Sequence, residues 1–411
     1  MKISFYGGVK EVTGANYLVE SDGVKILVDC GLHQGGHFAE KRNWEAFSYN
    51  PSTIEAVLIT HAHVDHIGRL PFLVKKGFRG KIYSTPPTRE AAELLLLDSD
   101  HILAQTAEHF KLPILFDDED VKRVMERWEG VDYYKQIVVG DLRFALYNAG
   151  HILGSAFVMI EADGKRIVFS GDLGNSPAPL LGDKDNLPET DYLVIESTYG
   201  DRLHEKLNQR KEILEDVVED TVKRGGTLMI PAFAMERTQE LVFELNQLVE
   251  QGRVPRVPMF IDSPLAIKLI DVYKKYKNYV NVPLNFNFPG IKMTLKTDES
   301  RAIGNTPPPK IILAGSGMSH GGRILHHEQL YLPDPRSTIL IIGYQAAGSL
   351  GRLILDGASS VKIFGEEISV NCRVANIAGY SAHADQSQLL QWLSPQRQVL
   401  EKVFLVQGEE Q

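Results

Sequence analysis

Three histidines and an aspartate crowd together in the segment Thr60-His61-Ala62-His63-Val64-Asp65-His66. Imidazole nitrogens and carboxylate oxygens are ligands that suit zinc. His61 and His63 are two residues apart and can reach one ion from a single loop, whereas Asp65 and His66 can hold a second ion. A histidine-rich surface loop is the alternative reading. Four ligand-type residues directly behind an apolar strand favour a metal site instead.

A strand and a helix are predicted to position this cluster. The run Ala56–Thr60 is short and apolar, as is typical of a buried strand, and Ile67–Leu73 leads towards a helix. The cluster therefore lies where a strand ends. Asp29 also follows a predicted strand, Lys25–Val28, and stands just before Gly31. It can be a simple turn residue, or it can support the metal loop from behind.

Two further ligand-type residues are predicted at strand ends. His151 lies in a glycine-containing turn, Asn148–Ser155, that follows the alternating strand Arg143–Tyr147. Asp172 follows the strand Lys165–Ser170. Each residue alone is weak evidence. Together with the upstream cluster they complete a set, with three histidines for one ion, a bridging carboxylate and ligands for a second ion.

Composition restricts the class of protein. The chain has 411 residues, of which 43% are hydrophobic and 24% charged, as expected for a globular protein of two or three domains. Its two cysteines, Cys30 and Cys372, form no Cys-x-x-Cys pair, so neither a disulfide framework nor a thiolate zinc site is indicated. No signal peptide is evident, and no apolar run approaches the roughly 18 residues that span a bilayer. We expect a cytoplasmic protein without a membrane partner.

The net charge of −9 argues against broad, non-specific adhesion to nucleic acid but permits a local positive cleft.

Residues 88–129 are predicted to be mostly helical, with Asp117 as an N-cap before Val121, Val124 and Trp128.

After Asp172 the pattern of predicted strands and helices changes. An apolar strand, Tyr192–Ile195, ends at Glu196, and from about residue 205 strands alternate with helices, which is typical of a parallel α/β domain. The stretch 283–309 contains five prolines and is predicted to be a surface loop or cover. Further strands are predicted at Thr227–Pro231, Met259–Asp262, Lys310–Ala314 and Ser337–Ile342, with helices over about 205–223, from about Arg237, from Pro264 and after Arg323.

A glycine-rich turn at 315–322 precedes one of these helices. Small residues before a helix N-terminus expose N–H groups to an anion, and Arg323 can add a forked contact to phosphate. A tight turn without a ligand is the alternative. His326 and His327 follow on the helix, where an ordinary role is favoured over a metal role.

The segment 60–66 with His151 and Asp172 resembles the metallo-β-lactamase superfamily over roughly the first 200 residues. This resemblance implies an αββα sandwich that carries zinc at one edge of its paired sheets. It leaves the substrate open, because the superfamily also includes thioesterases and lactonases.

Later motifs resemble the β-CASP branch of that superfamily, over essentially the whole chain. The branch cuts nucleic acids and includes the endonuclease subunit of the eukaryotic pre-mRNA 3′-end processing complex and its bacterial and archaeal relatives. Glu196, in Glu-Ser-Thr-Tyr-Gly, matches the acidic motif of the branch, and His383, in Ser-Ala-His-Ala-Asp, matches its second histidine motif. Other segments similar to its signatures are Pro231-Ala232-Phe233, Arg237-Thr238-Gln239, Asp262-Ser263-Pro264 and Gly343-Tyr344-Gln345.

The resemblance implies a metallo-β-lactamase αββα sandwich with an inserted parallel α/β β-CASP domain. The expected domains are residues 1–205 for the first part of the sandwich, 206–375 for the insertion and 376–411 for the return to the sandwich. Relatives continue for about another strand and helix beyond the position of Gln411, so a C-terminal truncation is expected.

One departure from the family concerns the second metal. Where the family places a further zinc-binding histidine, in a Val-His-Gly-Glu segment, this chain has Val406-Gln407-Gly408-Glu409. A neutral amide is a poor zinc ligand beside imidazole, and no histidine follows His383 in the sequence. The second ion is therefore expected to bind weakly.

The activity implied by the resemblance is hydrolysis of single-stranded RNA by two zinc ions, most simply by an endonuclease that leaves 5′-phosphate and 3′-hydroxyl ends. Zinc lowers the pKa of bound water to about 7 and stabilises charge on phosphoryl oxygens. The RNA would lie unpaired in a cleft between two domains. The implied ligands are His61, His63 and His151 for the first ion and Asp65 and His66 for the second, with Asp172 between them.

The same resemblance implies roles for residues around the metals. His383 would protonate the departing 3′ oxygen and would be oriented by Glu196, in a catalytic group that also contains Asp65 and Asp172. Asp29 would support the metal loop from behind. The residues expected to hold a neighbouring phosphate are Ser316, Gly317 and Arg323.

Two other functions remain open. The metal cluster alone would allow a hydrolase of small esters or thioesters, but the inserted domain and Ser381-Ala382-His383 argue against it. A non-catalytic RNA-binding or scaffolding paralogue is favoured by Gln407, although only this one ligand position is altered. The sequence does not distinguish an endonuclease from a 5′–3′ exonuclease, does not reveal an RNA preference, and is compatible with a homodimer.

Overall fold

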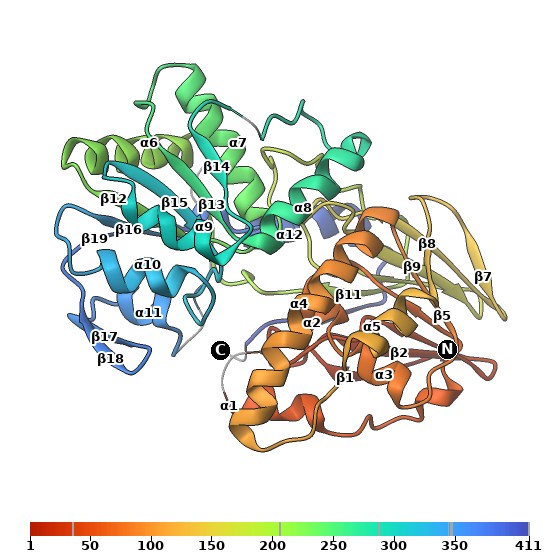
Figure 1. Ribbon diagram of the computed structural model, residues 1–411. Coiled ribbons are helices and arrows are strands. Elements are labelled where there is room, and N and C mark those ends of the chain that lie inside the picture. The colour runs from red at the N-terminus through yellow and green to blue at the C-terminus, as the bar shows by residue number, and fades with distance from the viewer. Residues whose placement is uncertain (35–36, 205–206, 287, 344, 346–347, 410–411) are drawn as a thin grey trace. The chain divides into compact units, whose positions relative to one another are not determined.

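The structure is a computed structural model that describes residues 1–411 except 35–36, 205–206, 287, 344, 346–347 and 410–411. The signature residue Tyr344 lies outside the described residues. The chain divides into two compact units (Figure 1): Met1–Leu203 with His383–Gln411 form the first, and His204–Ala382 form the second. The boundaries expected from the sequence, after residues 205 and 375, stay a prediction.

The first unit contains two sheets in the described residues. One has the order β1-β2-β3-β4-β5-β6 and the other has the order β20-β11-β10-β9-β8-β7. Strands of the first sheet are β1 (Lys2–Gly7), β2 (Asn16–Ser21), β3 (Val24–Val28), β4 (Ala56–Leu58), β5 (Lys81–Ser84) and β6 (Trp128–Gly130). Strands of the second are β7 (Ile137–Val139), β8 (Leu142–Asn148), β9 (Ala156–Ala162), β10 (Lys165–Phe169), β11 (Tyr192–Glu196) and β20 (Lys402–Val406).

The two sheets pack face to face through apolar side chains. Tyr17 and Val19 of the first sheet share a buried cluster with Phe144, Ile160 and Phe169 of the second. The rings of Tyr17 and Phe169 stack with their centroids 5.8 Å apart. Each such buried side chain contributes about 1.5–3 kcal/mol of transfer free energy, so the cluster fixes the two sheets against each other.

Helices cover the outer faces of this sandwich. Helix α12 (Gln386–Leu393) packs Leu389 and Trp392 against Phe157 and Leu193 on the outer face of the second sheet. On the side of the first sheet lie α2 (Val64–Ile67), α3 (Leu70–Lys75), α4 (Pro86–Phe110) and α5 (Asp118–Met125), and α1 (His37–Lys41) precedes them in the chain (Figure 1). The αββα architecture is confirmed.

The helical stretch at 88–129 is partly as expected. Asp117 caps α5, since its side chain accepts a hydrogen bond from the backbone N–H of Asp120. Trp128, predicted to be helical, lies instead in β6, where Ile82 of β5 pairs with it in parallel. Its apolar spacing from Val121 and Val124 imitates a helix, but pairing with a neighbouring strand decides the structure.

The second unit is built on one parallel sheet with the order β14-β13-β15-β12-β16-β19. The expected parallel α/β organisation is confirmed, and every residue of β16 is buried. Its strands are β12 (Thr227–Pro231), β13 (Met259–Asp262), β14 (Ile291–Met293), β15 (Lys310–Ala314), β16 (Thr338–Ile342) and β19 (Arg373–Ile377). Its helices are α6 (Leu207–Lys223), α7 (Arg237–Glu250), α8 (Pro264–Lys275), α9 (Thr297–Ala302), α10 (Ile324–Tyr331) and α11 (Leu350–Leu355), and a hairpin joins β17 (Ser360–Ile363) to β18 (Glu366–Ser369).

The prediction of a loop over 283–309 was wrong in part. The segment contains β14, which pairs in parallel with β13, and the short helix α9. Its prolines lie outside both elements, so they do not interrupt them. A strand of three residues is too short to show a period, and its pairing with β13 supplies what the local pattern lacks.

No helix in the described ranges is both long enough and apolar enough to span a bilayer.

Candidate metal centre

The carboxyl ends of parallel strands bring the predicted ligands to one edge of the sandwich. Strands β3 and β4 are parallel in the first sheet, and Asp29 and the 60–66 segment follow them. Strands β10, β11 and β20 are mutually parallel in the second sheet, with Glu196 opposite Val406. The residues that follow these strands therefore meet at one edge, as ligand-binding residues commonly do in parallel sheets.

The histidine segment is held by its backbone. Strand β4 ends at Leu58, His61 and His63 lie in the following loop, and α2 begins at Val64, earlier than expected, so that Asp65 and His66 are helical. The N–H of Cys30 donates to the carbonyl of His66 at 2.7 Å. A Cβ at Gly31 would lie 1.5 Å from the carbonyl oxygen of Asp65. Glycine at position 31 is thus required for this close approach.

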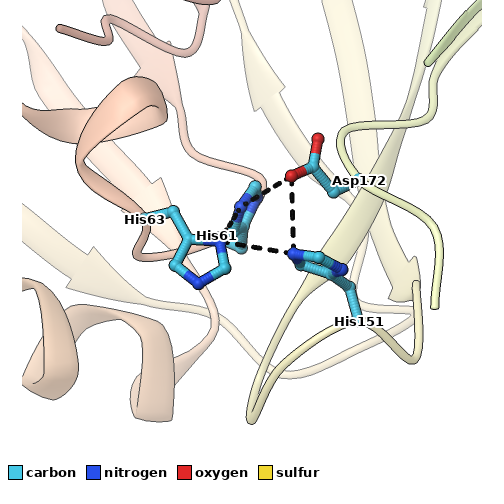
Figure 2. A group of neighbouring side chains, drawn as sticks. All are labelled: His61, His63, His151 and Asp172. Carbon is cyan, nitrogen blue, oxygen red and sulfur yellow. Dashed lines mark hydrogen bonds and ion pairs between the residues drawn. The ribbon is translucent and has the colours of Figure 1, made fainter. Parts of the chain in front are cut away.

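Four side chains converge on one point (Figure 2). His61 and His63 approach from the loop after β4, His151 comes from the loop between β8 and β9, and Asp172 follows β10. Nδ1 of His63 lies 3.0 Å from Nε2 of His61 and 3.3 Å from Nε2 of His151. Oδ2 of Asp172 lies 3.3 Å from the same atom of His61 and 3.4 Å from that of His151.

The donor atoms of this group have the geometry of a tetrahedral metal site. Tetrahedral zinc bonds of about 2.0–2.1 Å separate the ligand atoms by about 3.3–3.4 Å. The separations of 3.0–3.4 Å in this group are close to that length, and all four donors lie within 4.8 Å of one another. Burial lowers the pKa of His63 and of His151 well below the usual value, so both rings are neutral and can offer a lone pair.

Thr60 and Asp29 set the orientation of His61. The carboxylate of Asp29 can only accept, so the hydroxyl of Thr60 donates to Oδ2 of Asp29 at 2.8 Å. The same hydroxyl oxygen lies 3.1 Å from Nδ1 of His61 and can then accept its N–H. This assignment leaves Nε2 of His61 as the lone-pair atom that faces the other donors. Thr60 was not singled out from the sequence, although a hydroxyl directly before a ligand histidine is a signal for such an orienting contact.

Asp29 is fully buried and has a positive φ of 59°, which aspartate tolerates better than most residues. Its carboxylate accepts hydrogen bonds from the backbone N–H of Thr60 at 2.9 Å and from Nδ1 of His66 at 2.7 Å. These contacts favour the supporting role over a simple turn, and we retain that role as a proposal.

The other oxygen of Asp172 faces a different set of atoms. Oδ1 lies 3.4 Å from Nε2 of His66 and 2.7 Å from Nε2 of Gln407, and these two nitrogens are 2.9 Å apart. Oδ2 of Asp65 lies 3.8 Å from Nε2 of His66. Within the part of the chain that the structure describes, no group of three or more converging donors includes Asp65 or His66.

His383 and Glu196 lie beside Asp172. Nδ1 of His383 is 3.2 Å from Oε2 of Glu196, whose other oxygen accepts the N–H of Leu173 at 2.6 Å. Burial opposes a charge on His383, but the carboxylates of Glu196 and Asp172 outweigh it and raise the pKa of His383 to about 9. The side chain of His383 is 22% exposed, so a protonated imidazole next to the metal donors is accessible from outside.

The glycine-rich turn of the second unit is closed by its own contacts. The hydroxyl of Ser316 accepts the N–H of His320, and the carbonyl of Gly317 accepts from Gln345. The guanidinium of Arg323 donates to Asp262 and to the carbonyls of Thr294 and Leu295, at 2.8 Å each. A role for Ser316, Gly317 and Arg323 in holding phosphate stays a prediction.

Comparison with known proteins identifies the family to which this chain is similar. Three family models match: a metallo-beta-lactamase superfamily domain at residues 18–182, a Beta-Casp domain at 238–354, and a Zn-dependent metallo-hydrolase RNA specificity domain at 367–411. The chain is 36% identical to "Ribonuclease TTHA0252" of Thermus thermophilus, over 100% of this chain and 94% of the relative. The chain belongs to the β-CASP branch of the metallo-β-lactamase superfamily.

Other relatives support membership of the β-CASP branch. An "RNase J-like protein" of Methanocaldococcus jannaschii is 33% identical over 99% of this chain and 92% of the relative. "Transcription termination factor FttA" of Methanosarcina mazei is 31% identical over 100% of this chain and 67% of the relative.

A solved structure supports the fold alone. A crystal structure of a protein of unknown function from Enterococcus faecalis matches with a TM-score of 0.59 at 13% identity, over 99% of this chain and 93% of that one. The family and the four-donor cluster together make this β-CASP protein a metal-dependent hydrolase.

Proposed function

We propose that this β-CASP protein is a zinc-dependent endonuclease that cuts single-stranded RNA and leaves 5′-phosphate and 3′-hydroxyl ends. The observation that carries the proposal is the juxtaposition of a four-donor metal cluster with the His383–Glu196 pair. RNA as the substrate is supported by the match to an RNA specificity domain and by the similarity to a protein named as a ribonuclease.

The metal would be held by His61, His63, His151 and Asp172. Zinc is the ion that three imidazoles and one carboxylate in near-tetrahedral positions suit best. When bound, zinc supplies a Lewis acid that polarises a phosphoryl oxygen and lowers the pKa of water. The protein contributes a preorganised set of three imidazoles, of which His61 and His151 are buried, with His61 oriented by Thr60.

His383 would act as the general acid. With a pKa of about 9 it is protonated at neutral pH, and Glu196 holds Nδ1 so that Nε2 can deliver a proton to the departing 3′ oxygen. Asp65, whose side chain is 16% exposed, would accept a hydrogen bond from the attacking water.

A cleavage assay with a labelled circular single-stranded RNA tests the proposal, because a circle has no end for an exonuclease. Linear products with 5′-phosphate ends are expected. Removing the acid with His383→Ala should slow cleavage by about 10²–10⁴-fold. Zinc content should stay unchanged. If the circle stays uncut while linear RNA is degraded from its 5′ end, the protein is an exonuclease and not an endonuclease.

The leaving group separates acid catalysis from a structural role. A 3′-thiolate needs no proton to depart, so RNA with a sulfur in place of the 3′ bridging oxygen should be cut by His383→Ala and by the wild type at similar rates. Equal slowing on both substrates would remove His383 from the acid role.

A second candidate function is RNA binding without cleavage, and Gln407 is the observation that favours it. The amide contacts His66 and Asp172, where the family has a metal-binding histidine. Tight RNA binding with both circular and linear RNA left intact, at full zinc loading, would establish this function instead.

A further inference from the structure

The place for a second metal ion lies between Asp172 and His66, on the side of Asp172 away from the three-histidine cluster. Two atoms face each other there, Oδ1 of Asp172 and Nε2 of His66, 3.4 Å apart. Nε2 of Gln407 lies within hydrogen-bonding distance of both, at 2.7 Å and 2.9 Å. One atom of this chain thus contacts both donors that a second cation would need.

The protons in this group have one consistent arrangement. The carboxylate of Asp29 can only accept, so Nδ1 of His66 donates to it, and Nε2 of the same ring faces Oδ1 of Asp172 and the amide of Gln407. Oδ1 of Asp172 is an acceptor, and the amide nitrogen of Gln407 donates to it. With the amide reversed, its oxygen would face the carboxylate oxygen Oδ1 of Asp172, which can only accept, so the nitrogen belongs on this side; the amide oxygen has no hydrogen-bond partner among the described residues.

The backbone holds Gln407 in place. Its N–H donates to the carbonyl of Gly8 at 2.7 Å, and its carbonyl accepts from the hydroxyl of Thr198 at 3.1 Å. Its φ is 51°, in the left-handed region, and the residue is 1% exposed. With its backbone held, the side chain of Gln407 would have to leave Oδ1 of Asp172 and Nε2 of His66 to admit an ion there.

The two sides of Asp172 therefore differ in their fit to a metal. On the Oδ2 side, lone pairs of three imidazoles converge, and a cation satisfies them. On the Oδ1 side, the amide nitrogen of Gln407 already lies within hydrogen-bonding distance of Oδ1 and of Nε2 of His66, and it occupies the place where the expected second set would hold an ion. A histidine at position 407 would bring a further lone pair, whereas glutamine brings two protons.

We propose that the protein holds a single metal ion and that the side-chain amide of Gln407 takes the place of the second. The amide neutralises no charge, but it contacts the same two atoms and so keeps His66 and Asp172 in position. This inference rests on the metal centre of the proposed function and does not depend on the RNA substrate.

Zinc stoichiometry of the full chain is the test. The protein is stripped with a chelator, loaded with excess zinc, dialysed, and measured by elemental analysis and by native mass spectrometry. We expect one zinc ion per chain in the wild type and two in Gln407→His. Gln398→His, which adds a histidine at an exposed position of the same unit, should remain at one.

Two zinc ions in the wild type, or none, would overturn the inference. A single ion in folded Gln407→His would also overturn it, because the amide would then not be what excludes the second ion. If Gln407→His does not fold, Gln407→Glu, which has the same length and adds a carboxylate, is expected to reach two ions.

Failure of this inference and failure of the nuclease proposal give different results. One zinc ion with no cleavage of RNA leaves the single-metal centre standing and removes the nuclease. Two zinc ions with cleavage of RNA would remove the single-metal centre and leave the nuclease proposal standing.

Discussion

Asp172 in the first unit and Asp262 in the second are both buried carboxylates at the carboxyl end of a parallel strand, yet their neighbours differ. Asp262 accepts hydrogen bonds from His327, Ser300, Thr294 and Arg323, at 2.6–2.8 Å. Burial opposes ionisation, but these four donors outweigh it and lower the pKa of Asp262 to about 2. Oδ2 of Asp172 faces imidazole nitrogens that offer lone pairs.

The difference shows what separates a structural carboxylate from a metal ligand. A buried carboxylate surrounded by N–H and O–H groups has hydrogen-bond donors for its oxygens and stabilises its unit. One surrounded by lone pairs is incomplete until a cation joins it. Asp172 combines both conditions, since Oδ2 faces His61 and His151 whereas Oδ1 accepts from Gln407.

His151→Gln should have the largest effect, because it gives Oδ2 of Asp172 the kind of neighbour that Oδ1 already has. A neutral amide is a poor zinc ligand, so zinc and RNA cleavage should both fall to background. Elemental analysis and the circle assay measure these losses. His101→Gln, at an exposed position of α4, is the control and should leave both unchanged. Zinc retained at the wild-type level would contradict the four-donor assignment.

Asp262→Ala should lower the stability of the fold and not the zinc content, because it removes a structural carboxylate. It leaves Arg323 and His327 without their buried partner, and the expected loss in the free energy of unfolding is about 3–5 kcal/mol. Denaturant unfolding measures the loss, and zinc content should not change. Asp271→Ala, at an exposed position on α8, should be nearly neutral. Loss of zinc in folded Asp262→Ala would break the distinction between the two carboxylates.

Asp29→Asn should have a smaller effect on the metal centre. It weakens the acceptor that orients Thr60 and His66, and such supporting changes lower metal affinity or activity by about 10–100-fold. A zinc titration against a competing chelator gives the affinity. Asp22→Asn is a matched control, since Asp22 also has a positive φ, 48°, at the end of a strand but is exposed. Equal effects of both variants would assign the loss to the backbone.

Glu328 is a third kind of buried carboxyl, with few hydrogen-bond donors around it. The smallest expected effect is the one that its titration has on the stability of the fold. Its one side-chain donor among the described residues is Ser319, and burial outweighs that contact to raise the pKa of Glu328 to about 8. Because the folded-state pKa is raised, the protonated carboxyl stabilises the fold most below its usual pKa of 4.5, and this contribution is lost as pH rises through 8.

Melting temperatures at pH 5 to 9 test this sign. The wild type should lose stability relative to Glu328→Gln as pH rises, because glutamine stays neutral. The exposed Glu126→Gln should follow the wild type. A wild type that gains stability relative to Glu328→Gln would show that Glu328 is ionised in the folded protein.

The convergence of the candidate ligands was predictable because strand ends are visible in the sequence. Apolar runs stop and ligand-type residues follow at His61, His151 and Asp172, and parallel strands then bring these positions to one edge. The capping residue Asp117 was predictable for a similar reason, since its contact spans only three residues.

Contacts between distant residues were not predictable in the same way. Gln407 was recognised as an altered ligand position, but its hydrogen bonds to His66 and Asp172 depend on the pairing of β20 with β11. His327 was expected to have an ordinary role, and nothing in its local sequence indicates Asp262 as its partner, 65 positions away. Local periodicity contains no information about such partners.

The pairing of β20 with β11 also has a consequence for the order in which the protein is made. Gln407 is 235 positions beyond Asp172. At about 5–20 residues per second, roughly 10–50 s of synthesis separate them. From the synthesis of β11 until β20 is made, β11 lacks this neighbour, and an open strand edge invites pairing with other nascent chains. The three histidines and Asp172 leave the ribosome first, so the metal site can load while the sheet beside it is still unfinished.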